Sequence, residues 1–98
     1  MKNEKGLQNW IIGQCRESGI LCEKIESKSA RGWPDLVLMY GGRVVWIEVK
    51  SPTGKGRLSD AQMRCHAKMW DVGGWVYTVG TVELATAIIR NLMNGDLI

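Results

Sequence analysis

The chain has 98 residues, which is enough for one compact domain and too few for two. Hydrophobic residues make up 45% and charged residues 23%, which excludes a disordered or fibrous chain. The net charge is only +3, but nine of the 13 basic residues and four of the 10 acidic ones lie between Lys24 and Lys68. The basic character is therefore concentrated in the middle of the sequence.

No targeting or membrane segment is expected. The first six residues are polar, unlike a signal peptide, and no apolar run approaches the ~20 residues of a membrane span. The three cysteines form no C-x-x-C pair, which favours reduced thiols and a cytoplasmic location. A zinc site made by Cys15, Cys22, Cys65 and His66 is an alternative that the spacing disfavours. With no repeat and no linker, residues 1–98 are expected to form a single domain.

The first third of the chain is predicted to form a helix and a strand. Apolar residues at helical spacing indicate a helix over residues 5–18, with Gly19 at its C-terminal end. A weakly patterned strand is expected over residues 20–26. The polar segment 27–33 is predicted to be a loop, and Pro34 opens the next strand, where a missing N–H does little harm.

A β-hairpin is predicted next. The runs 36–40 and 44–49 are rich in β-branched and aromatic residues, and Gly41-Gly42 between them is typical of a two-residue turn. A flexible basic loop over residues 51–57 follows the hairpin.

A second helix is expected to begin after Ser59. Gln62, three residues later, completes a capping box. The apolar face of this helix is predicted to consist of Met63, Ala67 and Trp70. Gly73-Gly74 ends it.

The last part of the chain is predicted to form a strand over residues 75–79 and a third helix with Thr81 as N-cap. The apolar face of this helix comprises Leu84, Ala85, Ile88, Ile89 and Leu92. The element order is α-β-β-β-α-β-α, which indicates an α/β fold with a mixed sheet, covered by helices, and the hairpin at its centre.

The turn predicts the register of the hairpin. If Gly41-Gly42 is the whole turn, Tyr40 faces Arg43, and Asp35 then faces Glu48. Because side chains alternate between faces, one face carries Asp35, Val37, Met39, Val44, Trp46, Glu48 and Lys50, and the other is purely apolar. A three-residue turn would slip this register and separate the two acids.

Opposed acids on a hairpin point to a cation site. Directly facing carboxylates have Cβ atoms about 5 Å apart and destabilise a sheet, whereas Mg²⁺ between them would reverse the sign of the interaction. Lys50, two residues beyond Glu48 on the same face, can reach an attacking water or a phosphate. This set suffices for metal-assisted phosphodiester hydrolysis. The alternative is that Asp35 caps the strand start while Glu48 and Lys50 form an exposed strand pair.

These residues carry a family resemblance. Pro34-Asp35 followed by Glu48-Val49-Lys50 resembles the P-D-x(n)-(D/E)-x-K signature of restriction-endonuclease-like nucleases. The wider pattern resembles the VRR-NUC (virus-type replication-repair nuclease) family over roughly residues 4–90. It comprises Gly32-Trp33-Pro34-Asp35, Gly41-Gly42-Arg43, Trp46-Ile47-Glu48-Val49-Lys50, Leu58-Ser59-Asp60-Ala61-Gln62 and Gly73-Gly74-Trp75 with Val76-Tyr77.

The resemblance implies a restriction-endonuclease-like αβββαβ core, Mg²⁺ or Mn²⁺ dependence and DNA endonuclease activity. The metal ligands implied are Asp35, Glu48, the backbone carbonyl of Val49 and Glu4 on the first helix. The catalytic set implied is Asp35, Glu48, Lys50 and Gln62. Glu4 has an alternative role at a helix N-terminus. Some relatives have Tyr where this chain has His66, and a helix-surface histidine is expected there.

DNA contacts are expected from basic residues around the motif. They are Lys28, Arg31, Lys55, Arg57, Arg64 and Lys68, and such contacts make binding sensitive to salt and insensitive to sequence. Gly54-Lys55-Gly56 lacks the spacing of a P-loop, so no nucleotide cofactor is expected.

Stand-alone members of the family resemble phage or prophage proteins that act as dimeric resolvases of four-way (Holliday) junctions. A junction needs two paired nicks, which a C₂ homodimer would supply. The apolar surface of the third helix, with Trp75, Leu97 and Ile98, is the expected interface. The alternatives are cleavage of flap, fork or duplex DNA, or a non-catalytic DNA-binding module of a phage complex.

Overall fold

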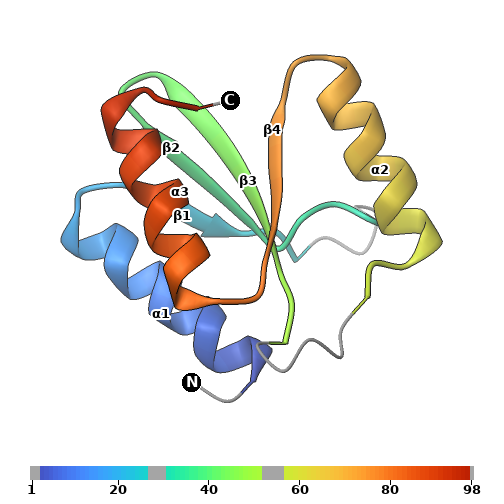
Figure 1. Ribbon diagram of the computed structural model, residues 1–98, viewed down its shortest axis with the longest axis horizontal. Coiled ribbons are helices and arrows are strands. Elements are labelled where there is room, and N and C mark those ends of the chain that lie inside the picture. Colours follow the sequence, from blue (N-terminus) through green and yellow to red (C-terminus); the bar gives the residue numbers. More distant parts are fainter. Residues whose placement is uncertain (1–2, 27–30, 52–56, 98) are drawn as a thin grey trace.

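A computed structural model describes residues 3–26, 31–51 and 57–97. Its elements are α1 (Glu4–Glu17), β1 (Leu21–Lys24), β2 (Leu36–Tyr40), β3 (Arg43–Val49), α2 (Asp60–Asp71), β4 (Trp75–Val79) and α3 (Val82–Asn94) (Figure 1). This is the predicted order. Lys28, Lys55, Ile98 and most of the expected basic loop lie outside the described residues. None of the helices in the described part is long and apolar enough to cross a membrane.

The sheet is mixed, with the strand order β1-β2-β3-β4. β1 with β2 and β2 with β3 are antiparallel pairs, whereas β3 and β4 are parallel. Parallel neighbours need a crossover connection, and α2 lies in that connection. The hairpin therefore occupies the centre of the sheet, as predicted.

The hairpin register is the predicted one. Tyr40 pairs with Arg43 and Leu36 with Ile47, so the turn consists of Gly41 and Gly42. These glycines have φ of +58° and +77°, a left-handed conformation that costs other residues free energy. If this register is continued by one residue beyond the pair Leu36–Ile47, Asp35 lies opposite Glu48.

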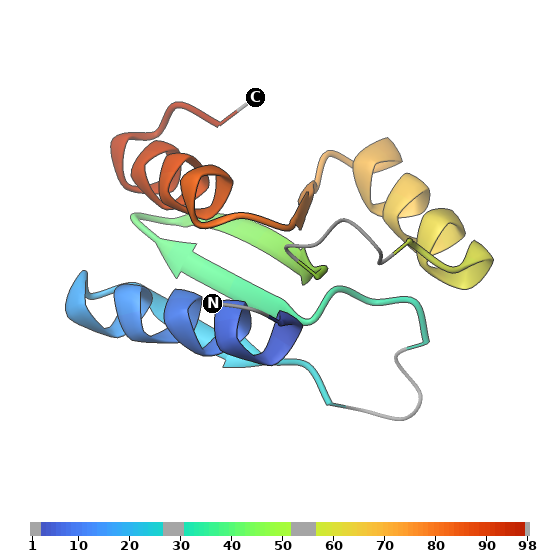
Figure 2. The ribbon, with the colours of Figure 1, turned by 60° about the horizontal axis from the view of Figure 1, so that its bottom comes forward.

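The core lies on the apolar face of the sheet. α1 and α3 pack against each other and against this face, side by side in Figure 1. The fully buried residues of the core include Leu7, Ile11, Cys15, Leu36, Leu38, Val45, Ile47, Val79, Ala85 and Leu92. The other face of the sheet carries Glu48, which α2 contacts through Gln62. In Figure 2, α2 and the segment before β2 lie on the side of the molecule opposite to α1 and α3.

The face of α3 is largely used by this core. Ala85, Ile88, Ile89 and Leu92 are buried, and only Leu84 of the predicted face is exposed, at 43%. Most of the face expected at a dimer interface is therefore covered by the sheet, and the interface itself stays a prediction.

The predicted apolar face of α2 is also wrong. Met63, Ala67 and Trp70 are exposed, and the buried residues of this helix are His66 and Met69. The helix turns Gln62 and His66 inward, where Gln62 donates to Glu48 of the hairpin and His66 has a hydrogen bond with the Gly32 backbone, while Trp70 packs edge-on against Tyr77 of β4. The expectation of a helix-surface His66 is corrected with it, since this side chain is only 6% exposed.

The cysteines do not form a zinc site. All three are free; Cys15 of α1 lies beside Cys22 of β1, and Cys65 lies on α2. Among the described residues no group of three or more His, Cys, Asp or Glu side chains gathers around one point.

Arg43 ties the hairpin to the end of α3. Its Nε donates to the carbonyl of Leu92 at 2.8 Å and its Nη2 to that of Met93 at 3.0 Å. The last turn of α3 contains no basic residue of its own. Arg43 therefore supplies both the hydrogen bonds and the positive charge that a helix C-terminus favours.

Arg43→Ala is expected to lower the free energy of unfolding by about 2 kcal/mol, because two charge-assisted hydrogen bonds are lost. Urea denaturation measures this. Arg90→Ala, which removes an exposed arginine of α3, is the matched control and should change stability by less than about 0.5 kcal/mol. Equal losses for the two variants would contradict the role given to Arg43.

Candidate active site

Asp35 is held at the entrance of β2 by two backbone contacts. Its Oδ2 accepts a hydrogen bond from the backbone N–H of Val49 at 2.8 Å. Its carbonyl accepts one from the N–H of Ile25 at 2.8 Å. The first contact reaches across to β3 and keeps the carboxylate beside Glu48, as the register predicts.

Glu48 is a buried acid on the face opposite to the core. Its side chain is 3% exposed. Oε2 accepts a hydrogen bond from Gln62 Nε2 at 3.0 Å and lies 3.5 Å from Lys50 Nζ. Oε1 is buried with no hydrogen-bond partner among the described residues. The alternative of an exposed Glu48–Lys50 strand pair is thereby excluded, and one buried carboxylate oxygen has no hydrogen-bond partner in the described part of the chain.

Gln62 connects the helix cap to the acids. Its Oε1 accepts from the N–H of Ser59 at 2.8 Å and from Lys50 Nζ at 3.4 Å, while its own N–H donates to Ser59 Oγ at 3.1 Å. The capping box and the contact with Glu48 exist together; the capping box is thereby confirmed, and the catalytic role of Gln62 stays a prediction. The cap fixes the amide that orients Glu48 and Lys50.

The electrostatics of the pair keep a proton on Glu48 near neutral pH. Burial and, to a smaller extent, the nearby Asp35 carboxylate raise the pKa of Glu48, and the Lys50 ammonium opposes the rise, so that the pKa is about 7. With a proton on Glu48 the two acids can share a hydrogen bond. Without one, they repel each other in a place that water hardly reaches.

His66 is a neutral side chain beside the acids. Burial lowers its pKa, a hydrogen bond with the Gly32 backbone raises it, the Lys50 charge lowers it, and that of Asp35 raises it. Its Nε2 is buried without a hydrogen-bond partner in the described part of the chain. His66 therefore joins α2 to the segment that leads into Asp35.

The oxygen donors of this site fit a divalent cation. Two close carboxylates, one of them with a buried unpartnered oxygen, are ligands that Mg²⁺ and Mn²⁺ prefer. Asp35 and Glu48, with the carbonyl of Val49, would hold the ion. Figures 1 and 2 show the first turn of α1 at the same end of the sheet as the end of β3. Glu4 on that turn is exposed, and its role as a metal ligand stays a prediction.

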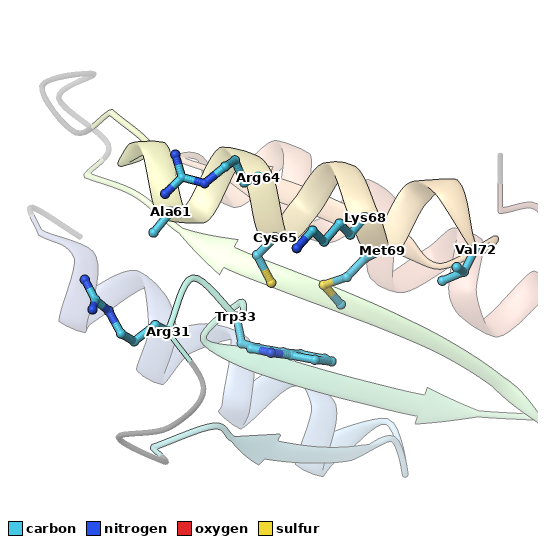
Figure 3. A pocket seen from close by; sticks show the side chains of 8 residues that line it. All are labelled: Arg31, Trp33, Ala61, Arg64, Cys65, Lys68, Met69 and Val72. Atoms are coloured by element: carbon cyan, nitrogen blue, oxygen red, sulfur yellow. The ribbon is translucent and has the colours of Figure 1, made fainter.

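Three of the predicted DNA-contact residues come together. Arg31, before β2, and Arg64 and Lys68, on α2, line one pocket together with Trp33 (Figure 3). Arg57 is exposed before α2. Lys28 and Lys55 lie outside the described residues.

Gly32 makes the closest approach between this segment and α2. It has φ +82°, and a Cβ added there would lie 2.5 Å from the carbonyl oxygen of Ala61 and 3.0 Å from Cys65 Cβ. Sequence reasoning missed this contact, because nothing in a Gly-Trp-Pro-Asp stretch shows what packs on it.

Gly32→Ala is expected to destabilise the protein by roughly 2–4 kcal/mol, since left-handed backbone strain adds to a clash with backbone. Gly19→Ala is the matched control: Gly19 has φ +73°, but its Cβ would meet nothing within 4 Å, so only the strain of about 1–2 kcal/mol is expected. Thermal denaturation compares the two. A loss at Gly32 no larger than that at Gly19 would contradict the close packing.

A solved structure described as a VRR_NUC domain matches with a TM-score of 0.78 and 23% sequence identity, over 92% of this chain and 97% of that one. No protein-family model and no curated protein matches the sequence. The structural match confirms the restriction-endonuclease-like fold that the sequence resemblance implied.

Proposed function

We propose that this chain, which has the fold of a VRR_NUC domain, is a metal-dependent endonuclease that hydrolyses phosphodiester bonds of branched DNA. The observation that carries the proposal is the buried Glu48, set beside Asp35 with one unpartnered oxygen and tied to Lys50 and Gln62. A fold gains no stability from opposed buried acids, so their function is the reason to expect them there.

Each side chain has a role in such a reaction. A divalent cation bound by Asp35 and Glu48 would offset negative charge on the scissile phosphate. Lys50, whose side chain is 16% exposed, places an ammonium beside that phosphate and stabilises the charge that develops on it. Gln62 holds both Lys50 and Glu48 in place, and is a positioning residue.

The DNA is proposed to be bound through its backbone. Arg31, Arg64 and Lys68, which line one pocket, and the exposed Arg57 would contact phosphates, with Lys28 and Lys55 in the same role. Binding should then fall steeply with salt and depend little on sequence.

We further propose that the active form is a homodimer acting on four-way junctions. One domain offers one set of acids, and a symmetric junction requires two nicks. The sheet covers most of the apolar face of α3, so this face has little area left for an interface. Light scattering at micromolar concentration should give the mass of two chains; the mass of one chain would contradict the dimer.

The test of function uses labelled four-way junction, flap, fork and linear duplex, each with Mg²⁺, Mn²⁺ or EDTA. Paired nicks in the junction with either cation, and none with EDTA, are expected. Preferential cleavage of flap, fork or duplex DNA would support the nuclease activity and contradict the preference for four-way junctions. Tight binding without cleavage of any DNA would indicate a non-catalytic DNA-binding module instead.

A further inference from the structure

A pocket of about 640 Å³ lies beside the acids, between α2 and the segment that leads into β2. In Figure 3 the indole ring of Trp33 lies below α2, with the sulfur atoms of Cys65 and Met69 above it. Trp33 is 43% exposed and is held edge-on against Trp46, with ring centroids 5.1 Å apart. The volume is in the range of small-ligand sites, and an aromatic ring forms one of its walls.

The rim of the pocket is strongly basic. Arg31, Arg64 and Lys68 line it, and no acidic side chain among the described residues does. Figure 3 shows the guanidinium groups of Arg31 and Arg64 toward the same end of the pocket. A flat apolar wall with cations around it matches a nucleotide, whose base stacks while its phosphate pairs with arginine and lysine.

The pocket adjoins the proposed cleavage site. Trp33 precedes Asp35 by two residues, so their Cα atoms are at most about 7 Å apart. On the other wall, α2 carries Gln62 toward Glu48 and Cys65 toward the pocket. A DNA strand whose phosphate lies at the acids therefore has a neighbouring nucleotide within reach of Trp33.

We infer that the pocket binds one unpaired, unstacked nucleotide next to the scissile phosphate, with its base on Trp33 and its phosphate among Arg31, Arg64 and Lys68. The inference rests on the proposed nuclease function. Bases inside a duplex have both faces covered, so only an unpaired base at a branch, or one turned out of the stack, can use the ring. The pocket thus selects DNA by an unstacked nucleotide rather than by sequence, and at a four-way junction this would be a base turned out of the stack at the branch point.

The test measures binding in EDTA, where no cleavage occurs, to a flap DNA and to the same flap with an abasic site at the first, second or third unpaired position. The wild-type protein should bind one of the abasic flaps about 5- to 150-fold more weakly, because a base stacked on an aromatic side chain is lost. Trp33→Leu should bind the intact and the abasic flaps equally.

Trp70→Leu is the matched control. Trp70 is 42% exposed and packs edge-on against Tyr77, with ring centroids 5.8 Å apart, but it does not line the pocket. This variant should keep the wild-type preference for the base. If Trp33→Leu does not fold, Arg64→Gln and Lys68→Gln serve instead. Each should weaken binding to all flaps and reduce the slope of log affinity against log salt concentration by about 1.

Three outcomes would overturn the inference. The first is equal binding of all flaps by the wild-type protein. The second is a preference for the intact over the abasic flap that survives in Trp33→Leu. The third is a change of oligomeric mass in Trp33→Leu, which would assign the pocket to a second copy of the chain. Failure of the proposed function looks different: the protein would keep its preference for the base in EDTA and cut no DNA when Mg²⁺ is added.

Discussion

Lys50→Ala is expected to reduce the single-turnover rate of DNA cleavage by about 10²- to 10⁴-fold. The Lys50 ammonium is the cation closest to Glu48 in the described site, 3.5 Å from its Oε2, and is held by Gln62 at 3.4 Å. Preorganised charge aimed at a developing negative charge contributes factors of this size. Binding to DNA in EDTA should change far less, because Lys50 is one cation among many.

Lys24→Ala is the matched control for Lys50→Ala, since it removes the same charge from the sheet. Lys24 on β1 pairs with Glu26 at 3.3 Å, and its side chain is 47% exposed. The control should cleave at the wild-type rate within a few fold. A similar loss in both variants would mean that net charge, and not the position of Lys50, supports cleavage.

Glu48→Gln is expected to stabilise the metal-free protein at pH 8 while abolishing cleavage. The pKa of Glu48 is raised from 4.5 to about 7, so the folded state binds the proton more tightly than the unfolded state. Between pH 4.5 and 7 the unfolded chain has released this proton and the folded chain has not, so stability falls as the pH rises. Above pH 7 the destabilisation is complete, on the order of 2–3 kcal/mol.

The measurement is urea denaturation in EDTA across this pH range, with the wild-type protein and Glu48→Gln compared at each pH. The difference between them should be near zero at pH 4.5 and largest at pH 8. Adding Mn²⁺ at pH 8 should stabilise the wild-type protein and leave Glu48→Gln nearly unchanged. If the stabilities of the two proteins change with pH in parallel, folding does not raise the pKa of Glu48.

The centre of the fold could be predicted because local chemistry determines it. Two glycines in a left-handed turn leave one register for the hairpin, and that register places Asp35 opposite Glu48. The hydrogen bond from the Val49 N–H to the Asp35 carboxylate links the two strands beyond their last paired residues. Helix caps at Ser59 and Thr81 were readable for the same reason, since each depends on residues three positions apart.

The faces of α2 could not be read from hydrophobicity. A helix normally turns its apolar stripe inward, but α2 packs over an acidic site and turns Gln62 and His66 toward it. Met63 and Trp70 are left exposed as a result. Predictions from apolar periodicity fail where the inner side of a helix serves a polar site.

The pocket beside the site depends on tertiary contacts that no local pattern shows. Trp33 follows a turn and Arg64 lies on a helix 31 positions later, and Gly32 brings the two segments together only because it has no side chain. The sequence singled out the individual basic residues as expected DNA contacts, and that role stays a prediction. Their arrangement around one exposed ring was not.

Cleavage of a labelled four-way junction by Asp35→Asn in Mg²⁺, with binding measured in parallel in EDTA, tests the central claim most directly. The substitution keeps the shape of the side chain and an oxygen that can accept from Val49, but removes the charge that a cation requires. We expect the wild-type protein to cut the junction, and the variant to bind it with unchanged affinity and leave it intact. Cleavage by Asp35→Asn at the wild-type rate would contradict the assignment of Asp35 and Glu48 as the metal site.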